Sequence, residues 1–131
     1  MKIAHIAVYT EDIERSSEFY KLFGAKETNR TEIPDGNGKK ILVHLDIEGT
    51  VIELVCPSDK SKAKKNEGVV GHFCICTDNI EETGDMLRKA GVDSFIDDNP
   101  VEINIMGIFK KQFIKGPSGE IIELIQKKII L

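Results

Sequence analysis

The feature that most constrains this chain is an internal duplication. The segment HIAVYTEDIER, which begins at His5, returns in altered form as HFCICTDNIEE, which begins at His72. The same offset aligns three further pairs, Thr10 with Thr77, Ile13 with Ile80 and Gly24 with Gly91. Similarity at a fixed offset indicates two copies of one structural unit. We therefore expect two modules that share a fold.

Each copy opens with the pattern of a strand followed by a helix. IAHIAVY and VGHFCIC alternate their side chains with the period of two that strands have. Thr10 and Thr77 come next and are suitable helix N-caps, with acidic residues behind them that favour a helix start. Gly24 and Gly91 stand where a helix ends in a left-handed residue.

Three short strands are predicted after each helix. In the first copy they are KETNRTEI, ILVHLDI and TVIELVC, separated by the turns PDGNGKK and EGT. In the second copy they are DSFID, MGIFKKQFIK and EIIELIQ, with GPSG as a hairpin turn. Each half therefore reads β-α-β-β-β. The expected fold is α+β, with two tandem βαβββ modules that form curved mixed sheets.

A length of 131 residues is compatible with one compact unit or with two fused small modules. The two modules are expected to form one domain over residues 1–131. The first module covers residues 1–56 and the second covers residues 70–131. The lysine-rich connector 57–69 joins them and has the polarity of a solvated link.

Composition excludes several classes of function. A net charge of -4 argues against a nucleic-acid partner, because phosphate binding needs a basic excess. No apolar run approaches the ~20 residues that cross a bilayer, and the N-terminus lacks a signal-peptide pattern, so no membrane partner is expected. The three cysteines, Cys56, Cys74 and Cys76, fit neither a zinc ribbon nor a disulfide framework. A reduced, cytoplasmic protein is expected.

Four residues stay polar inside otherwise apolar strands, namely His5, Glu53, His72 and Glu123. Strand alternation puts each glutamate on the face opposite its Ile and Leu neighbours, and hence away from the helices. This face is otherwise largely apolar, and a carboxylate there is costly unless it is paired or bound to a metal. Two histidines and two carboxylates supply the mixed nitrogen and oxygen donors that divalent transition metals take.

With these residues in place, the chain resembles the vicinal oxygen chelate superfamily, which includes glyoxalase I. The resemblance covers essentially the whole chain and is carried most clearly by HIAVYTEDIERSSEFY and FIKGPSGEIIELI. It implies that His5, Glu53, His72 and Glu123 bind one divalent ion, with Ni, Zn, Co and Mn all compatible. It further implies that Glu123 acts as the catalytic base and that Glu53 is the matching carboxylate of the first module.

The function expected from this resemblance is that of a metal-dependent lyase or isomerase of the glyoxalase type. Such an enzyme transfers a proton next to a carbonyl on a small, metal-chelated substrate. Glutathione-dependent members usually carry Arg and Asn where this chain has Tyr9 and Pro57. The residues that hold glutathione are therefore not retained, and another thiol adduct or a substrate without a thiol is expected.

Two alternative functions stay open. One is an acyl-CoA epimerase of the same superfamily, although that group usually has Gln where this chain has Glu53. The other is a metal-free binding protein for a drug or small molecule, of the bleomycin-resistance type. Those proteins line their groove with aromatic residues, whereas this chain has no Trp and only 6% aromatic residues.

The remaining predictions concern the substrate pocket and assembly. Tyr9, Cys74 and Cys76 share a strand face with the histidines, and Tyr9 and Cys74 are candidates for the pocket. His44, in ILVHLDI, has no counterpart in the second copy and is interpreted as structural. The resemblance implies a homodimer in which the first module of one chain pairs with the second module of its neighbour.

Overall fold

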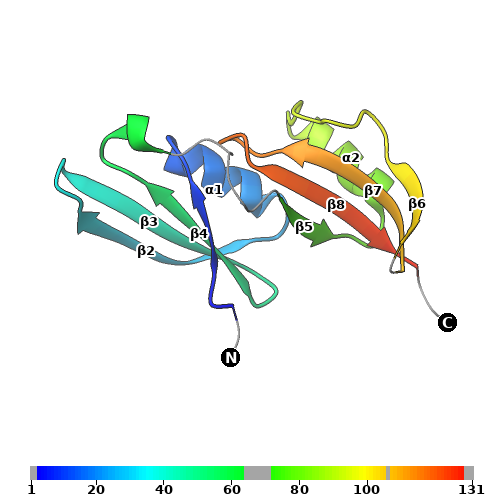
Figure 1. The fold of residues 1–131 in the computed structure, drawn as a ribbon, viewed down its shortest axis with the longest axis horizontal. Coiled ribbons are helices and arrows are strands. Elements are labelled where there is room, and N and C mark those ends of the chain that lie inside the picture. Colours follow the sequence, from blue (N-terminus) through cyan, green and yellow to red (C-terminus); the bar gives the residue numbers. More distant parts are fainter. Residues whose placement is uncertain (1–2, 64–71, 106, 129–131) are drawn as a thin grey trace. The chain divides into compact units, whose positions relative to one another are not determined.

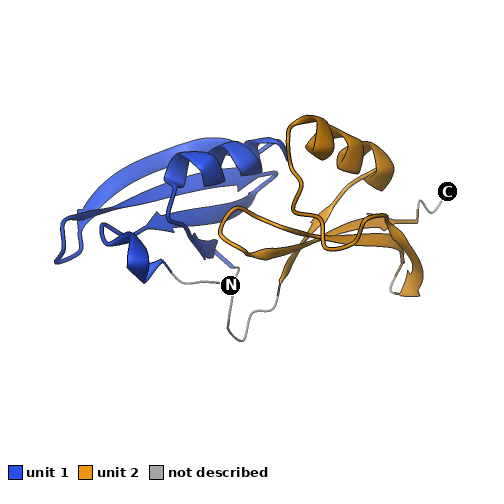
Figure 2. Ribbon diagram, turned by 90° about the horizontal axis from the view of Figure 1, so that it is seen from above, with its two compact units in different colours: residues 1–66 blue, residues 67–131 orange. Residues whose placement is uncertain are grey.

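The computed structural model describes residues 3–63, 72–105 and 107–128. The chain divides into two compact units, Met1–Asn66 and Glu67–Leu131, coloured separately in Figure 2. Residues 64–69 of the predicted connector and the first two residues of the predicted strand VGHFCIC lie outside the described residues.

Unit 1 is a four-stranded mixed sheet with one helix against it (Figure 1). Its elements in chain order are β1 (Ile6–Tyr9), α1 (Ile13–Lys21), β2 (Lys26–Pro34), β3 (Lys39–Ile47), β4 (Thr50–Cys56) and the short 3₁₀ helix η1 (Lys60–Lys62). The strand order is β1-β4-β3-β2, in which β1 runs parallel to β4 and the other neighbours are antiparallel. The first strand thus lies beside the last.

Unit 2 repeats this arrangement. Its elements are β5 (Phe73–Cys76), α2 (Ile80–Lys89), β6 (Val101–Ile105), β7 (Ile108–Lys115) and β8 (Ile121–Lys127), and its strand order is β5-β8-β7-β6. The predicted α+β fold with two tandem βαβββ modules is confirmed. Neither α1 nor α2 is long and apolar enough to cross a membrane.

One predicted strand is wrong. The segment DSFID is not a strand, and the edge strand of unit 2 is β6, further along the chain. DSFID instead lies along the second half of β7, where Phe95 forms an isolated bridge with Ile114 and the backbone N–H of Ile96 donates to the Phe113 carbonyl at 2.9 Å. The first half of β7 is left to the strand-forming run VEINI, which pairs with it as β6.

Each helix covers one face of its own sheet, and the core forms there. In unit 1 the α1 side chains pack on β3 and β4, and the buried set includes Phe19, Tyr20, Val43, Leu45, Ile52 and Leu54. In unit 2 α2 packs on β7 and β8, with Ile80, Leu87, Ile114, Ile122 and Leu124 buried. Apolar burial of this kind contributes most of the stability of a small unit. Within the described residues, neither α1 nor α2 covers the opposite face of its own sheet.

The helix starts differ in detail from the prediction. The N-caps are Asp12 and Asn79, whose side chains accept from the backbone N–H groups of Arg15 and Glu82. Thr10 lies two residues earlier and closes the turn before the helix, because its hydroxyl accepts from the Asp12 N–H at 3.0 Å. The predicted helix ends are correct, since Gly24 and Gly91 have positive φ angles of 86° and 91°.

The Asp12 cap offers a test of this local structure. Replacing Asp12 by Ala removes the acceptor for an exposed helix N–H, and we expect the free energy of unfolding to fall by about 0.5–2 kcal/mol. Asp12→Asn is the matched control, because asparagine caps about as well as aspartate. Urea denaturation measures both. An unfolding midpoint for Asp12→Ala equal to that of the unaltered chain would contradict the assignment of Asp12 as the cap.

Candidate metal centres

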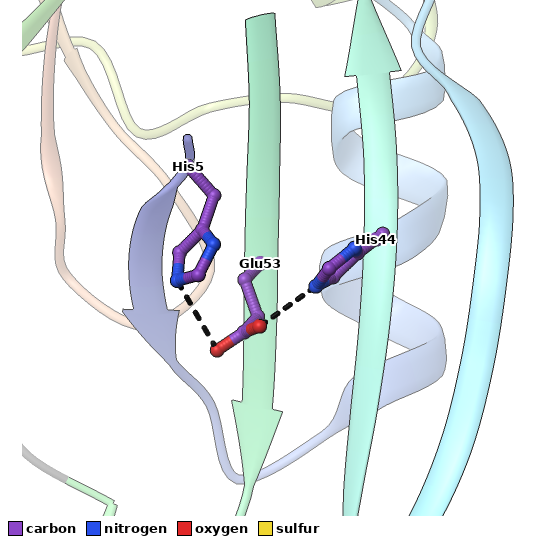
Figure 3. A group of neighbouring side chains, drawn as sticks. All are labelled: His5, His44 and Glu53. Carbon is purple, nitrogen blue, oxygen red and sulfur yellow. Dashed lines mark hydrogen bonds and ion pairs between the residues drawn. The ribbon is translucent and has the colours of Figure 1, made fainter. Parts of the chain in front are cut away.

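Three polar side chains of unit 1 converge on the face of the sheet opposite α1. Strand register places Ala7 of β1 and His44 of β3 on either side of Glu53 in the central strand β4. His5 precedes Ala7 by two residues, so it lies on the same face. Figure 3 shows His5, which directly precedes β1, and His44 on β3 pointing toward Glu53 from its two sides.

The two histidines lie next to different oxygens of the Glu53 carboxylate. His44 Nε2 donates to Glu53 Oε2 at 2.7 Å, and His5 Nε2 lies 3.7 Å from Oε1. The Glu53 side chain is 16% exposed, against 33% for His44 and 40% for His5. The donor atoms all lie within 4.8 Å of one another. This cluster is a compact set of two nitrogens and one carboxylate that is partly open to solvent.

His44 joins this cluster, although the sequence gives no metal role to it because the second copy has no matching histidine. In unit 2 Phe113 occupies the corresponding register position, opposite Glu123. A signal was nevertheless available in the sequence. His44 interrupts the apolar run of ILVHLDI on the same strand face as Asp46, opposite Val43 and Leu45, which are buried in the core.

Unit 2 carries a cluster of different chemistry at the equivalent place. His72, Cys74 and Glu123 have donor atoms within 4.8 Å of one another. The Cys74 thiol donates to Glu123 Oε1 at 3.1 Å, and its register partner across the sheet is Glu123 itself. The His72 ring meets Phe113 edge to face, with 5.5 Å between centroids. The structure thus groups His5 with Glu53 and, in the other unit, His72 with Glu123.

The Cys74 thiol is strongly perturbed. Desolvation by partial burial is the main cause and raises its pKa to about 11, and the adjacent Glu123 carboxylate acts in the same direction through a hydrogen bond and its charge. A thiolate beside a carboxylate is unfavourable without a cation to offset the charge. Cys74 is therefore a protonated thiol at neutral pH in the absence of a metal.

The pocket candidate Tyr9 and the cysteine Cys76 lie at the ends of β1 and β5. Tyr9 is in register with Val55 and shares a strand face with His5, and it is partly buried. Cys76 is in register with Ile125 and shares a face with Cys74, and it is exposed.

Comparison with known proteins agrees with this architecture. A sequence model of the Glyoxalase/Bleomycin resistance protein/Dioxygenase superfamily matches residues 2–124. The chain belongs to this superfamily. The match confirms the resemblance read from the duplicated segments.

Two curated relatives illustrate the range of the superfamily. The chain is 30% identical over 132 residues to the "Probable lactoylglutathione lyase" of Vibrio cholerae, which covers 97% of this chain and 91% of the relative. It is 28% identical over 104 residues to the mitochondrial methylmalonyl-CoA epimerase of Mus musculus, covering 74% of this chain and 57% of the relative. This superfamily member therefore resembles proteins with two different named activities.

Solved structures share its fold. The glyoxalase I of Leishmania major superposes with a TM-score of 0.72 at 24% identity, covering 96% of this chain and 86% of that chain. A fosfomycin resistance protein FosX variant from Listeria monocytogenes, complexed with Mn(II), has a TM-score of 0.70 at 15% identity, with coverage of 95% and 90%. At such low identity these likenesses establish the fold of the superfamily member and nothing more.

The raised pKa of Cys74 predicts that alkylation of its thiol reaches its full rate only at unusually high pH. With EDTA present, the rate of Cys74 modification by iodoacetamide should still climb about tenfold per pH unit between pH 8 and 10, because the thiolate is the reactive form. Peptide mass spectrometry follows the site directly. Glu123→Gln should move the profile to lower pH, since it removes the adjacent negative charge while the burial remains. A plateau reached by pH 9 would contradict the assigned environment.

Proposed function

We propose that this superfamily member is a metal-dependent lyase or isomerase that transfers a proton next to a carbonyl on a small chelated substrate. The observation that carries the proposal is the repeated pairing of an imidazole with a carboxylate. His5 lies beside Glu53 in unit 1, and His72 is grouped with Glu123 in unit 2. Each pair occupies the face of its sheet that its own helix leaves uncovered.

The proposed ligands of a divalent ion are His5, Glu53, His72 and Glu123. Imidazole nitrogen and carboxylate oxygen are donors that Zn, Ni, Co and Mn all accept, so the residues fit such an ion. The related FosX variant from Listeria monocytogenes was solved in complex with Mn(II). A bound divalent ion would supply Lewis acidity toward two neighbouring substrate oxygens and so acidify the adjoining C–H bond.

Glu123 is proposed as the catalytic base and Glu53 as the more firmly held carboxylate. Glu53 accepts a charge-assisted hydrogen bond from His44 and has His5 on its other oxygen. Glu123 instead accepts from the Cys74 thiol, which is a weak donor. The carboxylate with the weaker partner moves more easily, and can accept a proton from a substrate carbon and return it to the neighbouring carbon.

The substrate is proposed to be a thiol adduct other than that of glutathione, or a compound without a thiol. Tyr9 and Pro57 replace the Arg and Asn that glutathione-dependent members usually carry. An assay of hemithioacetal isomerisation with several thiols and several metals tests this directly. Turnover of the glutathione adduct with a low Michaelis constant would refute the proposed thiol choice and leave the reaction class standing.

An acyl-CoA epimerase is the second candidate function. The murine epimerase relative supports it, and the chemistry is the same removal and return of a proton next to a carbonyl. Exchange of the substrate α-proton with deuterium oxide distinguishes the two candidates, because it is measured separately for an acyl-CoA and for a hemithioacetal. A metal-free binding protein of the bleomycin-resistance type would exchange neither.

A cytoplasmic location is also proposed. Cys56, Cys74 and Cys76 are all free thiols, and Cys74 and Cys76 are exposed. Exposed free thiols persist in a reducing compartment and are oxidised in an oxidising one.

The base assignment predicts different consequences for the two glutamates. Glu123→Gln should lower turnover by about 10²–10⁴-fold with little loss of bound metal, because an amide oxygen can still ligate but cannot accept the proton. Glu53→Gln is the matched control and should lower turnover far less, because its amide oxygen can also ligate the metal and Glu53 does not accept the proton. Steady-state kinetics and metal analysis on the same samples decide the matter. Parallel losses in Glu123→Gln would show that Glu123 acts only as a ligand.

A twofold homodimer is proposed, in which His5 and Glu53 from one chain act with His72 and Glu123 from its neighbour. Mixing inactive His5→Ala and Glu123→Ala chains should then restore roughly a quarter of the activity, because each mixed dimer carries one site with both lesions and one with none. Subunit exchange is verified with a tagged chain. Exchange without recovered activity would place all four residues of a site within one chain.

A further inference from the structure

We propose that unit 1 is a metal site by itself, with His44 as a third ligand beside His5 and Glu53. This inference goes beyond the proposed function, because it needs no residue of unit 2 and no pairing of units. It also assigns a metal-binding role to a histidine that the duplication leaves without a counterpart.

The geometry of the three donors fits a single ion. Two ligands at right angles on an ion, each about 2.1 Å from it, lie about 3.0 Å apart. The separations from Glu53 are 2.7 Å to His44 Nε2 and 3.7 Å to His5 Nε2, which bracket this value. Glu53 lies on β4, His44 lies on the adjacent strand β3, and His5 directly precedes β1 on the other side of β4, so side-chain rotations can bring the three donors onto one centre.

The surroundings also suit an ion. All three side chains are partly exposed, so an ion can enter from solvent and keep positions open for water or substrate oxygens. Two imidazoles and one carboxylate form the donor set of many open divalent-metal sites. The single carboxylate offsets only one of the two charges of the ion, which leaves the centre electrophilic.

A purely structural role for His44, that of holding Glu53 in place, is the competing explanation. Unit 2 argues against it. There the register position opposite Glu123 is filled by Phe113, so the fold does not require a hydrogen-bond donor at that place. The third donor of unit 2 comes instead from Cys74, on the strand at the other side of Glu123. Each unit thus has three possible metal ligands, and the third is a different residue in each. This is expected if three ligands are needed to hold an ion.

The count of ligating histidines, compared between the unaltered chain and His44→Gln, tests the inference. With one equivalent of Co²⁺, each ligating imidazole gives its own strongly shifted exchangeable N–H signal in the proton NMR spectrum. The chain has three histidines, so ligation by His44 predicts three such signals when His72 also binds. The four-ligand site of the proposed function predicts two. Two signals that both survive in His44→Gln would overturn the inference.

A second test removes the contribution of unit 2. The full-length double variant with His72→Ala and Glu123→Ala should still bind one Co²⁺ per chain, measured by equilibrium dialysis, with two shifted N–H signals. Adding His44→Gln should weaken this binding by more than the ~10–100-fold expected for loss of a residue that only orients a ligand. Glutamine is chosen because its amide can still donate to Glu53. His44→Phe copies the residue found in unit 2, and His5→Ala gives the loss expected for a ligand.

The outcomes separate this inference from the proposed function. A double variant that binds no cobalt, while the unaltered chain binds one ion per pair of units, would overturn the unit 1 site and leave the four-ligand site standing. Unchanged affinity after His44→Gln, beside a large loss after His5→Ala, would also overturn it and make His44 a positioning residue. Urea denaturation of each variant confirms that the unit remains folded.

Discussion

The period-two alternation of strands against a helix-covered face is the constraint on which the rest of this structure depends. In β4 it sends Ile52 and Leu54 into the core beneath α1 and leaves Glu53 on the opposite face. In β8 it does the same with Ile122 and Leu124, and Glu123. A shift of one residue in register would bury the carboxylates against the helices, at a cost that a unit of this size cannot absorb. The same strand register therefore fixes both the buried core and the position of the polar cluster.

Duplication of this arrangement explains both the symmetry of the two clusters and their differences. The histidine before the first strand and the glutamate in the last strand are retained in both units. The third donor has diverged, being an imidazole on β3 in unit 1 and a thiol on β5 in unit 2. The backbone presents two positions beside each glutamate, one on each neighbouring strand. Unit 1 fills them with Ala7 and His44, and unit 2 fills them with Cys74 and Phe113.

The sequence predicts most of the fold, because two copies of one pattern support each other. Strand and helix order, the terminal glycines and the face of each glutamate follow from periodicity alone. Two local predictions fail, one because of a tertiary contact and one because of local hydrogen bonds. DSFID has a strand-like pattern, but β7 pairs with VEINI over its first half. Thr10 is a good cap by composition, yet Asp12 stands at the helix start and Thr10 takes the preceding turn.

Comparison of the two copies gives no signal for His44, because the residue has no counterpart. The position of His44 beside Glu53 nevertheless makes the two carboxylates chemically different. Hydrogen bonds from imidazole to carboxylate are charge-assisted and roughly twice as strong as those between neutral groups. Glu53 has such a partner at 2.7 Å, whereas Glu123 has a thiol at 3.1 Å whose proton is a poor hydrogen-bond donor. Two glutamates in equivalent backbone positions therefore have unequal freedom. This inequality supports the proposal that Glu123 of unit 2, rather than Glu53, is the carboxylate that accepts the proton.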